Sequence, residues 1–470
     1  MKYLYISIII FLVASLSVNA QEFTAIPVYN RMLDNIEKKN NVQYFKLPIY
    51  DIYEYVQSKN DSIPLSIHIG RENKRWILIP NKMMSENVRV RTSDHGLFKD
   101  IFIDKKCTTF KGINIDNGEI ESVFISDKNI FFKIKRDGHI KEVYSTKLRN
   151  KGGDRNTIIM EDIDQSGFSV DKQCGTESKA KIRKLEKKIG IGKTRVQQPL
   201  SCREVSVGIA TDASVWSLFD ENVEDIIDFN LTLLGEVELL YDNFNLDFMV
   251  TEIYIHMDFV SSTNPWGEDV EASALLSNFG DFGDANFDTD IGHVWTNRDI
   301  NNDGNSITIG RAWVGGACGD IGIHQYAILE LFSSSLSDLA LLQAHEYGHL
   351  FDADHEPNTG TIMEPSLGAI TSNTWAAANI IEMEDFIEDE TCLFTCAHCP
   401  FNYHIIDQIV GGTWVYSSQN QTTTTADIKQ GADVTIKSQV TVKLLPGFNA
   451  SSLKELSGQT VVKVQIGVCE

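Results

Sequence analysis

The stretch QAHEYGHLFDADHEPNTGTIMEP, residues 343–365, holds three of the chain's eleven histidines within eleven residues. His345 and His349 are four residues apart, a spacing that places both side chains on one face of a helix, with Cβ atoms about 5–6 Å apart. Two imidazoles so placed can bind one zinc ion, and His355 can supply a third ligand if the chain turns back. The pattern predicts a zinc site with one coordination position left for water.

Glu346 lies between the first two histidines in the sequence and can point at a water on the metal. A carboxylate in that place can act as a general base. The helix must end near Phe351 for His355 to return, and the next residue is then expected in the left-handed conformation. Glycine is usual there, but this chain has Asp352, a residue type that tolerates the conformation better than most others.

The elements around these residues follow from periodicity. The zinc helix is expected to begin after Ser335, which forms a possible capping box with Asp338. Another helix is expected to be capped by Asp220, with an apolar stripe over residues 223–237. Strands are predicted at EVSVGIA, FMVTEIYIHM, DIGHVWT and SITIGRAWVG, and a last helix at TWAAANIIEMEDFI. The order β-α-β-β-β-α-α indicates a mixed sheet with helices packed against it.

HEYGHLFDADH resembles the long zinc signature of the metzincin peptidases, with Asp352 in the position of a glycine. Met363 in GTIMEP resembles the methionine of the turn beneath the zinc, which packs under the ligands in that family. AWVGGACG, followed by a strand and the zinc helix, and TIM resemble the adamalysin/reprolysin family. Glu356 after the third histidine is instead the astacin choice.

The resemblance implies an α+β or α/β metzincin-like catalytic domain with a mixed sheet, a zinc helix and a Met-turn. It implies protein or peptide substrates, paired with an edge strand near residues 310–316. Reprolysins often carry calcium opposite the zinc, and Glu204 and Asp290 roughly match its ligands, so calcium is a candidate second ion. DINNDGNS is expected to be a solvated turn, because the twelfth position of its loop is Gly310 rather than Glu. The expected zinc ligands are His345, His349 and His355, with Glu346 catalytic.

Cys174, in KQCGTES, precedes a basic stretch of residues 177–198 that contains eight Lys or Arg. A thiolate is a good zinc ligand, so Cys174 in the open position would displace the catalytic water. The Cys-Gly pair resembles the cysteine switch of reprolysin and matrixin precursors, which implies a latent zymogen. The alternative is a disulfide between Cys174 and Cys107. The basic stretch is expected to be an exposed helix or linker that an activating protease cuts.

The chain is expected to have four parts. Residues 1–20 are predicted to be a secretory signal, because Lys2 and the apolar run ISIIIFLVASL precede the small-residue site VNA. A membrane anchor is the alternative, although the run is short, and no later stretch is apolar enough to span a bilayer. Residues 21–198 are expected to be a β-rich prodomain, 199–399 the catalytic domain and 400–470 a small all-β module. The predicted location is extracellular or at the cell surface.

The formal charge of −23 disfavours nucleic acid and anionic membranes as partners. Export favours disulfides, and the six cysteines outside the prodomain can pair fully in about 15 ways. The resemblance suggests that Cys318 pairs with one of the Cys392–Cys399 group. A zinc knuckle made of that group with His398 or His404 is the alternative. The six cysteines are Cys202, Cys318, Cys392, Cys396, Cys399 and Cys469.

These features together predict a secreted zinc endopeptidase made as a latent zymogen. One rival is a non-enzymatic surface-binding protein that has kept the fold. The other is a structural zinc domain closed by a fourth protein ligand. Glu346 argues against the rivals, because a structural zinc site does not need that carboxylate.

Overall fold

The structure is a computed structural model of the chain. It describes residues 20–28, 42–59, 62–103, 108–136, 139–149, 156–163, 172–176, 202–258, 264–301, 307–319 and 324–395, together with strands between 402 and 466. The predicted signal, the basic stretch 177–198 and Cys107, Cys396, Cys399 and Cys469 lie outside the described residues. Within the described part, no helix has the length and apolar character to span a membrane.

The N-terminal half (residues 20–176) is rich in β-structure, as expected. Nine strands close into a barrel in the order β1-β2-β11-β10-β9-β8-β7-β4-β3. Helix α2 (Ile49–Gln57) packs its apolar side into the same core as Trp76 and Phe132. The barrel strands are β1 (Gln21–Pro27), β2 (Val42–Lys46), β3 (Ile63–Ile69), β4 (Glu72–Asn81), β7 (Thr109–Asn114), β8 (Ile120–Ile125), β9 (Ile130–Arg136), β10 (His139–Ser145) and β11 (Thr157–Ile163).

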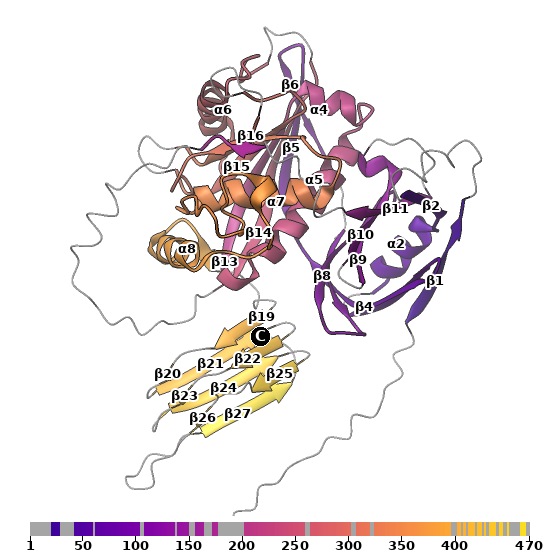
Figure 1. Ribbon diagram of the computed structural model, residues 1–470, viewed down its shortest axis with the longest axis vertical. Coiled ribbons are helices and arrows are strands. Elements are labelled where there is room, and N and C mark those ends of the chain that lie inside the picture. The colour runs from indigo at the N-terminus through magenta and orange to yellow at the C-terminus, as the bar shows by residue number, and fades with distance from the viewer. Residues whose placement is uncertain are drawn as a thin grey trace, which may run out of the picture.

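The central region (residues 202–395) is built on a mixed sheet, as predicted. Its order is β12-β16-β17-β15-β13-β14-β5-β6, and β16 is antiparallel to β17. Figure 1 shows β5 and β6, which belong to the N-terminal half, together with the strands of the central region. The strands are β5 (Met84–Asp94), β6 (Leu97–Ile101), β12 (Gln173–Cys174), β13 (Arg203–Thr211), β14 (Leu246–His256), β15 (Ile291–Thr296), β16 (Thr308–Ala312), β17 (Tyr326–Glu330) and β18 (Phe394–Thr395), which pairs with β13.

Helices cover both faces of this sheet. Side chains at alternate positions of β13 point to opposite faces, so Val205, Val207 and Ile209 share one core with α5 and α7, whereas Ala210 packs in the core under α6. The helices are α4 (Ala213–Leu218), α5 (Val223–Leu240), α6 (Ala272–Asn286), α7 (Leu336–Leu350) and α8 (Ala377–Asp389), with short 3₁₀ turns at Thr146–Arg149, Asp242–Phe244 and Leu367–Ala369.

One prediction about a helix was wrong, and α6 was not predicted. Asp220 does not cap α5: its φ is 50°, and the side chain of Asn222 accepts hydrogen bonds from the first-turn amides instead. Helix α6 was missed, because its glycines give it a weak helical pattern. A Cβ atom on Gly283 would lie 2.4 Å from the ring of Tyr326, so the glycine allows α6 to approach the sheet closely.

The described strands beyond residue 400 form three parallel three-stranded sheets. Consecutive strands go to different sheets, and every third strand returns to the same sheet, so the chain coils. Asn402 is level with Gln421, which is level with Thr441. The strands are β19 (Asn402–Ile405), β20 (Gln408–Ile409), β21 (Gly412–Ser418), β22 (Gln421–Thr424), β23 (Asp427–Ile428), β24 (Ala432–Ser438), β25 (Thr441–Leu444), β26 (Asn449–Ala450) and β27 (Val461–Ile466).

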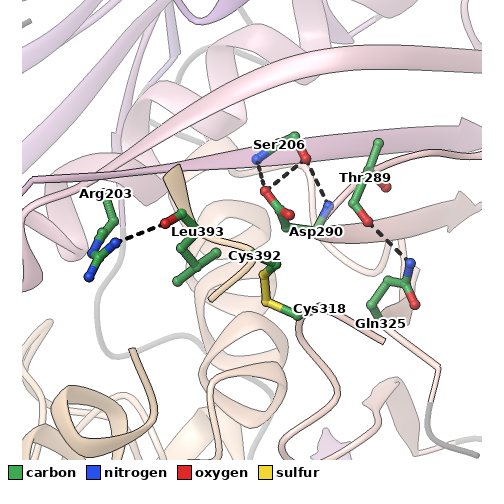
Figure 2. The surroundings of a disulfide bond; sticks show 8 residues. All are labelled: Arg203, Ser206, Thr289, Asp290, Cys318, Gln325, Cys392 and Leu393. Carbon is green, nitrogen blue, oxygen red and sulfur yellow. Dashed lines mark hydrogen bonds between the residues drawn. A yellow bond between two sulfur atoms is a disulfide. The ribbon is translucent and has the colours of Figure 1, made fainter. Parts of the chain in front are cut away.

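A disulfide joins Cys318, in the loop after β16, to Cys392, just after α8. This confirms the pairing of Cys318 with the Cys392–Cys399 group. Figure 2 shows the contacts around it, where the Asp290 carboxylate accepts hydrogen bonds from the Ser206 amide and hydroxyl at 2.7 and 2.8 Å. The Asp290 carbonyl accepts from the Cys318 amide at 2.8 Å, so the disulfide loop is held against β13 and β15. Cys202 is also disulfide-bonded.

His293 of β15 is fully buried between the sheet and α7. Its Nδ1 lies 2.7 Å from the Tyr347 hydroxyl, and burial lowers the pKa of His293 to about 3. Because the unfolded chain takes up a proton near pH 6.5 and the folded chain does not, the folded state loses stability as the pH falls from about 6.5 to 3.

We predict that His293→Gln flattens this dependence. The free energy of unfolding is measured with urea between pH 3.5 and 6.5. As the pH decreases, it should fall less steeply in the variant than in the wild type, by up to about 1.4 kcal/mol per pH unit. His139, which is exposed on β10, supplies the control, and His139→Gln should keep the wild-type slope. Identical slopes for all three proteins would contradict this assignment of the acid sensitivity.

Candidate metal centre

Helix α7 has a defined start and end. The side chain of Ser335 accepts a hydrogen bond from the Asp338 amide at 3.2 Å, as the predicted cap requires. The helix ends at Leu350, and Asp352 adopts a φ of 72°, which confirms the predicted left-handed residue. The Ala353 amide then donates to the Gly348 carbonyl at 2.9 Å. This turn sends the chain back toward the helix face that carries the histidines.

The three predicted histidines meet at one point. The Nε2 atom of His355 lies 3.3 Å from Nε2 of His345 and 3.2 Å from Nε2 of His349. Zinc–nitrogen bonds of about 2.0–2.1 Å at tetrahedral angles place neighbouring nitrogens about 3.3 Å apart. The observed spacing therefore fits three ligands of one zinc ion.

Backbone carbonyls fix the orientation of two of these rings. His345 Nδ1 lies 2.6 Å from the Ile362 carbonyl, and His349 Nδ1 lies 2.7 Å from the Ala353 carbonyl. Since Nδ1 must carry the proton in each contact, Nε2 presents its lone pair to the shared point. Burial lowers the pKa of His345 to about 3 and lowers the pKa of His349 and His355 as well, so the neutral imidazole that binds metals is favoured.

Met363 lies under the zinc helix and is fully buried. A Cβ atom on Gly348 would lie 2.7 Å from the Met363 sulfur and 3.0 Å from Trp375, so the bare backbone at this position makes room for both side chains. The Met363 carbonyl also accepts from the Glu356 amide at 2.9 Å. The residues around Met363 thus hold two parts of the site in place. The Ile362 carbonyl orients His345, and the Met363 carbonyl binds the chain that returns after His355.

Glu346 is buried between the histidines and β16. A Cβ atom on Gly310 would lie 2.6 Å from Glu346 Oε1, so the glycine lets the edge strand pass against the carboxylate. Oε2 lies 3.4 Å from the Thr176 hydroxyl, while Oε1 has no hydrogen-bond partner among the residues that the structure describes. Burial raises the pKa of Glu346 to about 8, although hydrogen bonds from Cys174 and Thr176 oppose the rise.

Cys174 lies at the same point as the histidines. Its sulfur is 3.5 Å from His349 Nε2, and the ligand atoms of Cys174 and all three histidines lie within 4.8 Å of one another. A zinc–sulfur bond of about 2.3 Å would place the sulfur about 3.6 Å from a nitrogen ligand. Cys174 is free of any disulfide, so the alternative pairing with Cys107 is wrong in this structure. The four side chains fit a closed tetrahedral site.

The segment Lys172–Thr176 crosses between β16 and the chain that follows Met363. The Gly175 amide donates to the Gly310 carbonyl at 2.8 Å, and the Cys174 amide donates to the Pro365 carbonyl at 3.0 Å. The Thr176 hydroxyl accepts from the Ala312 amide at 3.0 Å. The segment therefore occupies the free edge of β16 while it places the sulfur among the histidines.

Calcium is not supported. Glu204 and Asp290 do not form a cation-binding group in the described part of the chain, since Asp290 is clustered only with the disulfide-bonded Cys318 and Cys392. Of the loop that contains DINNDGNS, residues 302–306 lie outside that part. Elsewhere in the sheet, Nδ1 of the buried His256 lies 2.8 Å from the Ser93 hydroxyl.

Two residues at this site were not predicted. Thr176 could have been suspected, because it follows the Cys-Gly pair in the sequence. Glu142 carries no such signal, yet its carboxylate accepts hydrogen bonds at the start of α7 from the amides of Leu336 and Ser337, at 3.3 and 2.7 Å. It thereby binds the N-terminal half to the zinc helix.

The central region matches a known family. Residues 201–406 match the family model Reprolysin_5, metallo-peptidase family M12. Among solved structures, metalloproteinase-II from Bacteroides fragilis is similar at 14% sequence identity over 72% of this chain and 95% of that chain, with a TM-score of 0.43. The family match contains the histidines, Glu346 and Met363. The family match therefore supports a metzincin-like zinc metalloendopeptidase, with the M12-type region at residues 201–406.

Proposed function

We propose that this protein is a secreted endopeptidase that is made as a latent precursor and hydrolyses peptide bonds in protein substrates. The observation that supports this best is the convergence of His345, His349 and His355 beside Glu346 and an edge strand. A catalytic zinc site needs three protein ligands, a base and a place for an extended peptide. These residues provide all three.

His345, His349 and His355 would hold the zinc ion. When bound, zinc supplies Lewis acidity, which lowers the pKa of a water and polarises the scissile carbonyl. Glu346 Oε1, which has no hydrogen-bond partner within the described part, would take the proton of the attacking water. The same carboxyl then delivers the proton to the leaving amine. Fixed imidazoles and a buried carboxylate keep this arrangement in place before substrate arrives.

The substrate is expected to lie along β16 in place of the segment Lys172–Thr176. The Gly310 carbonyl and the Ala312 amide, which now bond to that segment, would bond to substrate backbone. Main-chain recognition of this kind favours extended chains, such as unfolded segments and loops. Latency would follow from the same contacts, because Cys174 would fill the fourth ligand position while its neighbours occupy the position of the substrate strand.

The rival reading is a structural zinc site closed by four protein ligands. Cys174 makes it a serious alternative in the uncut chain. A purely structural site has no use for a buried carboxylate beside the ligands, and burial of Glu346 at that place has an energetic cost. We therefore infer that Cys174 is a removable fourth ligand, released when an activating protease cuts within residues 177–198.

Glu346→Gln tests the general base. The zinc ligands are unchanged, so zinc content measured by mass spectrometry should stay at the wild-type value, whereas peptidase activity after cutting should fall about 10²–10⁴-fold. Glu221→Gln, an exposed substitution before α5, should keep full activity. A zinc-loaded Glu346→Gln enzyme with wild-type activity would exclude this role.

His355→Ala tests the third ligand. Once Cys174 has been released by cutting, two histidines on one helix leave the ion with an incomplete set of ligands, so the cut variant should lose most of its zinc during dialysis against a weak chelator. His139→Ala, which removes an exposed histidine of the barrel, should retain it. If His355→Ala kept its zinc as tightly as the wild type, the ion would have to be held by other residues.

Cys174→Ser tests latency. The hydroxyl is a much poorer zinc ligand than a thiolate, so the uncut variant should cleave an unfolded protein substrate faster than the uncut wild type. Gln173→Ala is the matched control, because it alters the exposed neighbour and leaves the sulfur in place. Equal, low activity of wild type and Cys174→Ser would mean that the segment blocks by covering β16.

A further inference from the structure

The two halves of the chain share one sheet. Strand β5 of the N-terminal half pairs in parallel with β14, with Arg89 level with Glu252 and Ser93 level with His256. Strand β6 continues the sheet beyond it. Removing the N-terminal half would therefore strip β5 and β6 from this side of the sheet and leave β14 with an unpaired edge.

The halves also share one hydrophobic core. A single cluster of buried side chains runs from the barrel wall into α5 and α7 without a break. An apolar core shared in this way is typical of permanent rather than transient interfaces. The barrel contributes Phe124, Phe131, Tyr144, Leu148 and Ile159, and the central region contributes Ile226, Ile227, Leu233, Leu234 and Leu341, among others.

Charges across this interface are complementary and mostly buried. Lys111 Nζ lies 2.6 Å from Glu238, and both side chains are at most 8% exposed. Lys133 pairs with Glu236, and the Ser126 hydroxyl donates to Asp228 at 2.7 Å. Separation would leave Glu238, Glu236 and Asp228 without these partners, on a surface that is otherwise apolar. Breaking such buried pairs is strongly unfavourable.

The segment Lys172–Thr176 is held far less extensively. It forms a two-residue strand, and backbone hydrogen bonds join it to Ile307, Gly310, Pro365 and Leu367. Its side-chain contacts are those of Cys174 and Thr176 and the Lys172–Glu330 ion pair at 3.5 Å, and the Ser366 hydroxyl donates to the Lys172 carbonyl. Neither Cys174 nor Thr176 belongs to the shared core. Release of this segment would therefore leave the shared core unchanged.

We propose that the N-terminal half remains bound after the chain is cut within residues 177–198, as a permanent second chain of the working enzyme. Activation then consists of the movement of residues 172–176 out of the cleft. The barrel keeps its contacts with α5, with β14 and with the start of α7. The proposal rests on the proposed cutting of the precursor, but the association that it predicts does not depend on peptidase activity.

The test uses the full chain with the recognition sequence of a site-specific protease inserted between residues 187 and 188, in a Glu346→Gln background so that the protein cannot digest itself. After complete cutting, both fragments should elute together at a 1:1 ratio in size-exclusion chromatography, at micromolar concentration in 0.15 M and in 1 M salt. Salt should matter little because the ion pairs are buried. Fragments that elute separately at micromolar concentration would overturn the proposal.

Lys111→Met identifies the contact that holds the halves together. It leaves Glu238 buried without its cation, so the dissociation constant of the cut protein should rise by about 100-fold or more. Lys135→Met is the matched control, because Lys135 is largely exposed and pairs with Glu119 inside the N-terminal half. Equal dissociation constants for the two variants would contradict the assigned interface.

Arg89→Ala is a second variant in case Lys111→Met does not fold. Arg89 is about half exposed, and it pairs with Glu252 at 2.5 Å, so its loss should raise the dissociation constant by roughly 10-fold. The same cut protein with Glu346 intact gives the functional readout. Its peptidase activity should elute with both fragments, and activity in fractions that contain only the C-terminal fragment would overturn the proposal. Absence of activity from the intact pair would instead count against the proposed endopeptidase function.

Discussion

The meeting of three imidazole nitrogens at one point constrains the whole of residues 345–363. Helix α7 can supply only two of them, so the chain has to reverse within a few residues of its end. The reversal requires the positive φ of Asp352, and the ring orientations require the carbonyls of Ala353 and Ile362. The chain beneath the helix then requires space, which Gly348 leaves for Met363. Each of these features follows from the geometry of one metal site.

The N-terminal half is built around the same helix. Glu142 binds the amides at the start of α7, and Cys174 reaches the histidines near its end. Two distant segments of that half therefore contact opposite ends of one helix. Helix α5 packs between the barrel and α7. Glu142 is buried, and its half also shares the core around α5, whereas Cys174 lies outside that core. A cut near Cys174 would therefore affect the contact of Cys174 with the histidines and leave the contact of Glu142 with α7 in place.

The sequence predicted the parts of the structure that depend on local spacing. The zinc helix, its left-handed end and strands β13–β16 follow from the histidine pattern and from alternation of apolar residues. Contacts between remote segments could not be predicted, because they produce no local pattern in the sequence. The pairing of β5 with β14 joins residues more than 150 positions apart, and no periodicity in residues 84–94 indicates a partner. Helix α6 was missed because Gly280 and Gly283 serve packing against His324 and Tyr326 rather than helix formation. The cap of α5 was assigned to Asp220, but Asp220 has a φ of 50° and the side chain of Asn222 accepts the first-turn hydrogen bonds.

The Cys318–Cys392 bond closes a covalent loop with a sequence separation of 74, and all three histidines lie inside it. Closing a loop of this length removes conformational entropy from the unfolded chain. In the chain-entropy model this stabilises the folded state by about 4 kcal/mol. A metal ion that joins His345 and His355 would cross-link part of the same loop. The two cross-links therefore restrict the same segment of the unfolded chain. The second cross-link to form removes less conformational entropy than it would remove alone. Their stabilising effects should overlap rather than add, so a reduced protein depends more on its metal than an oxidised one does.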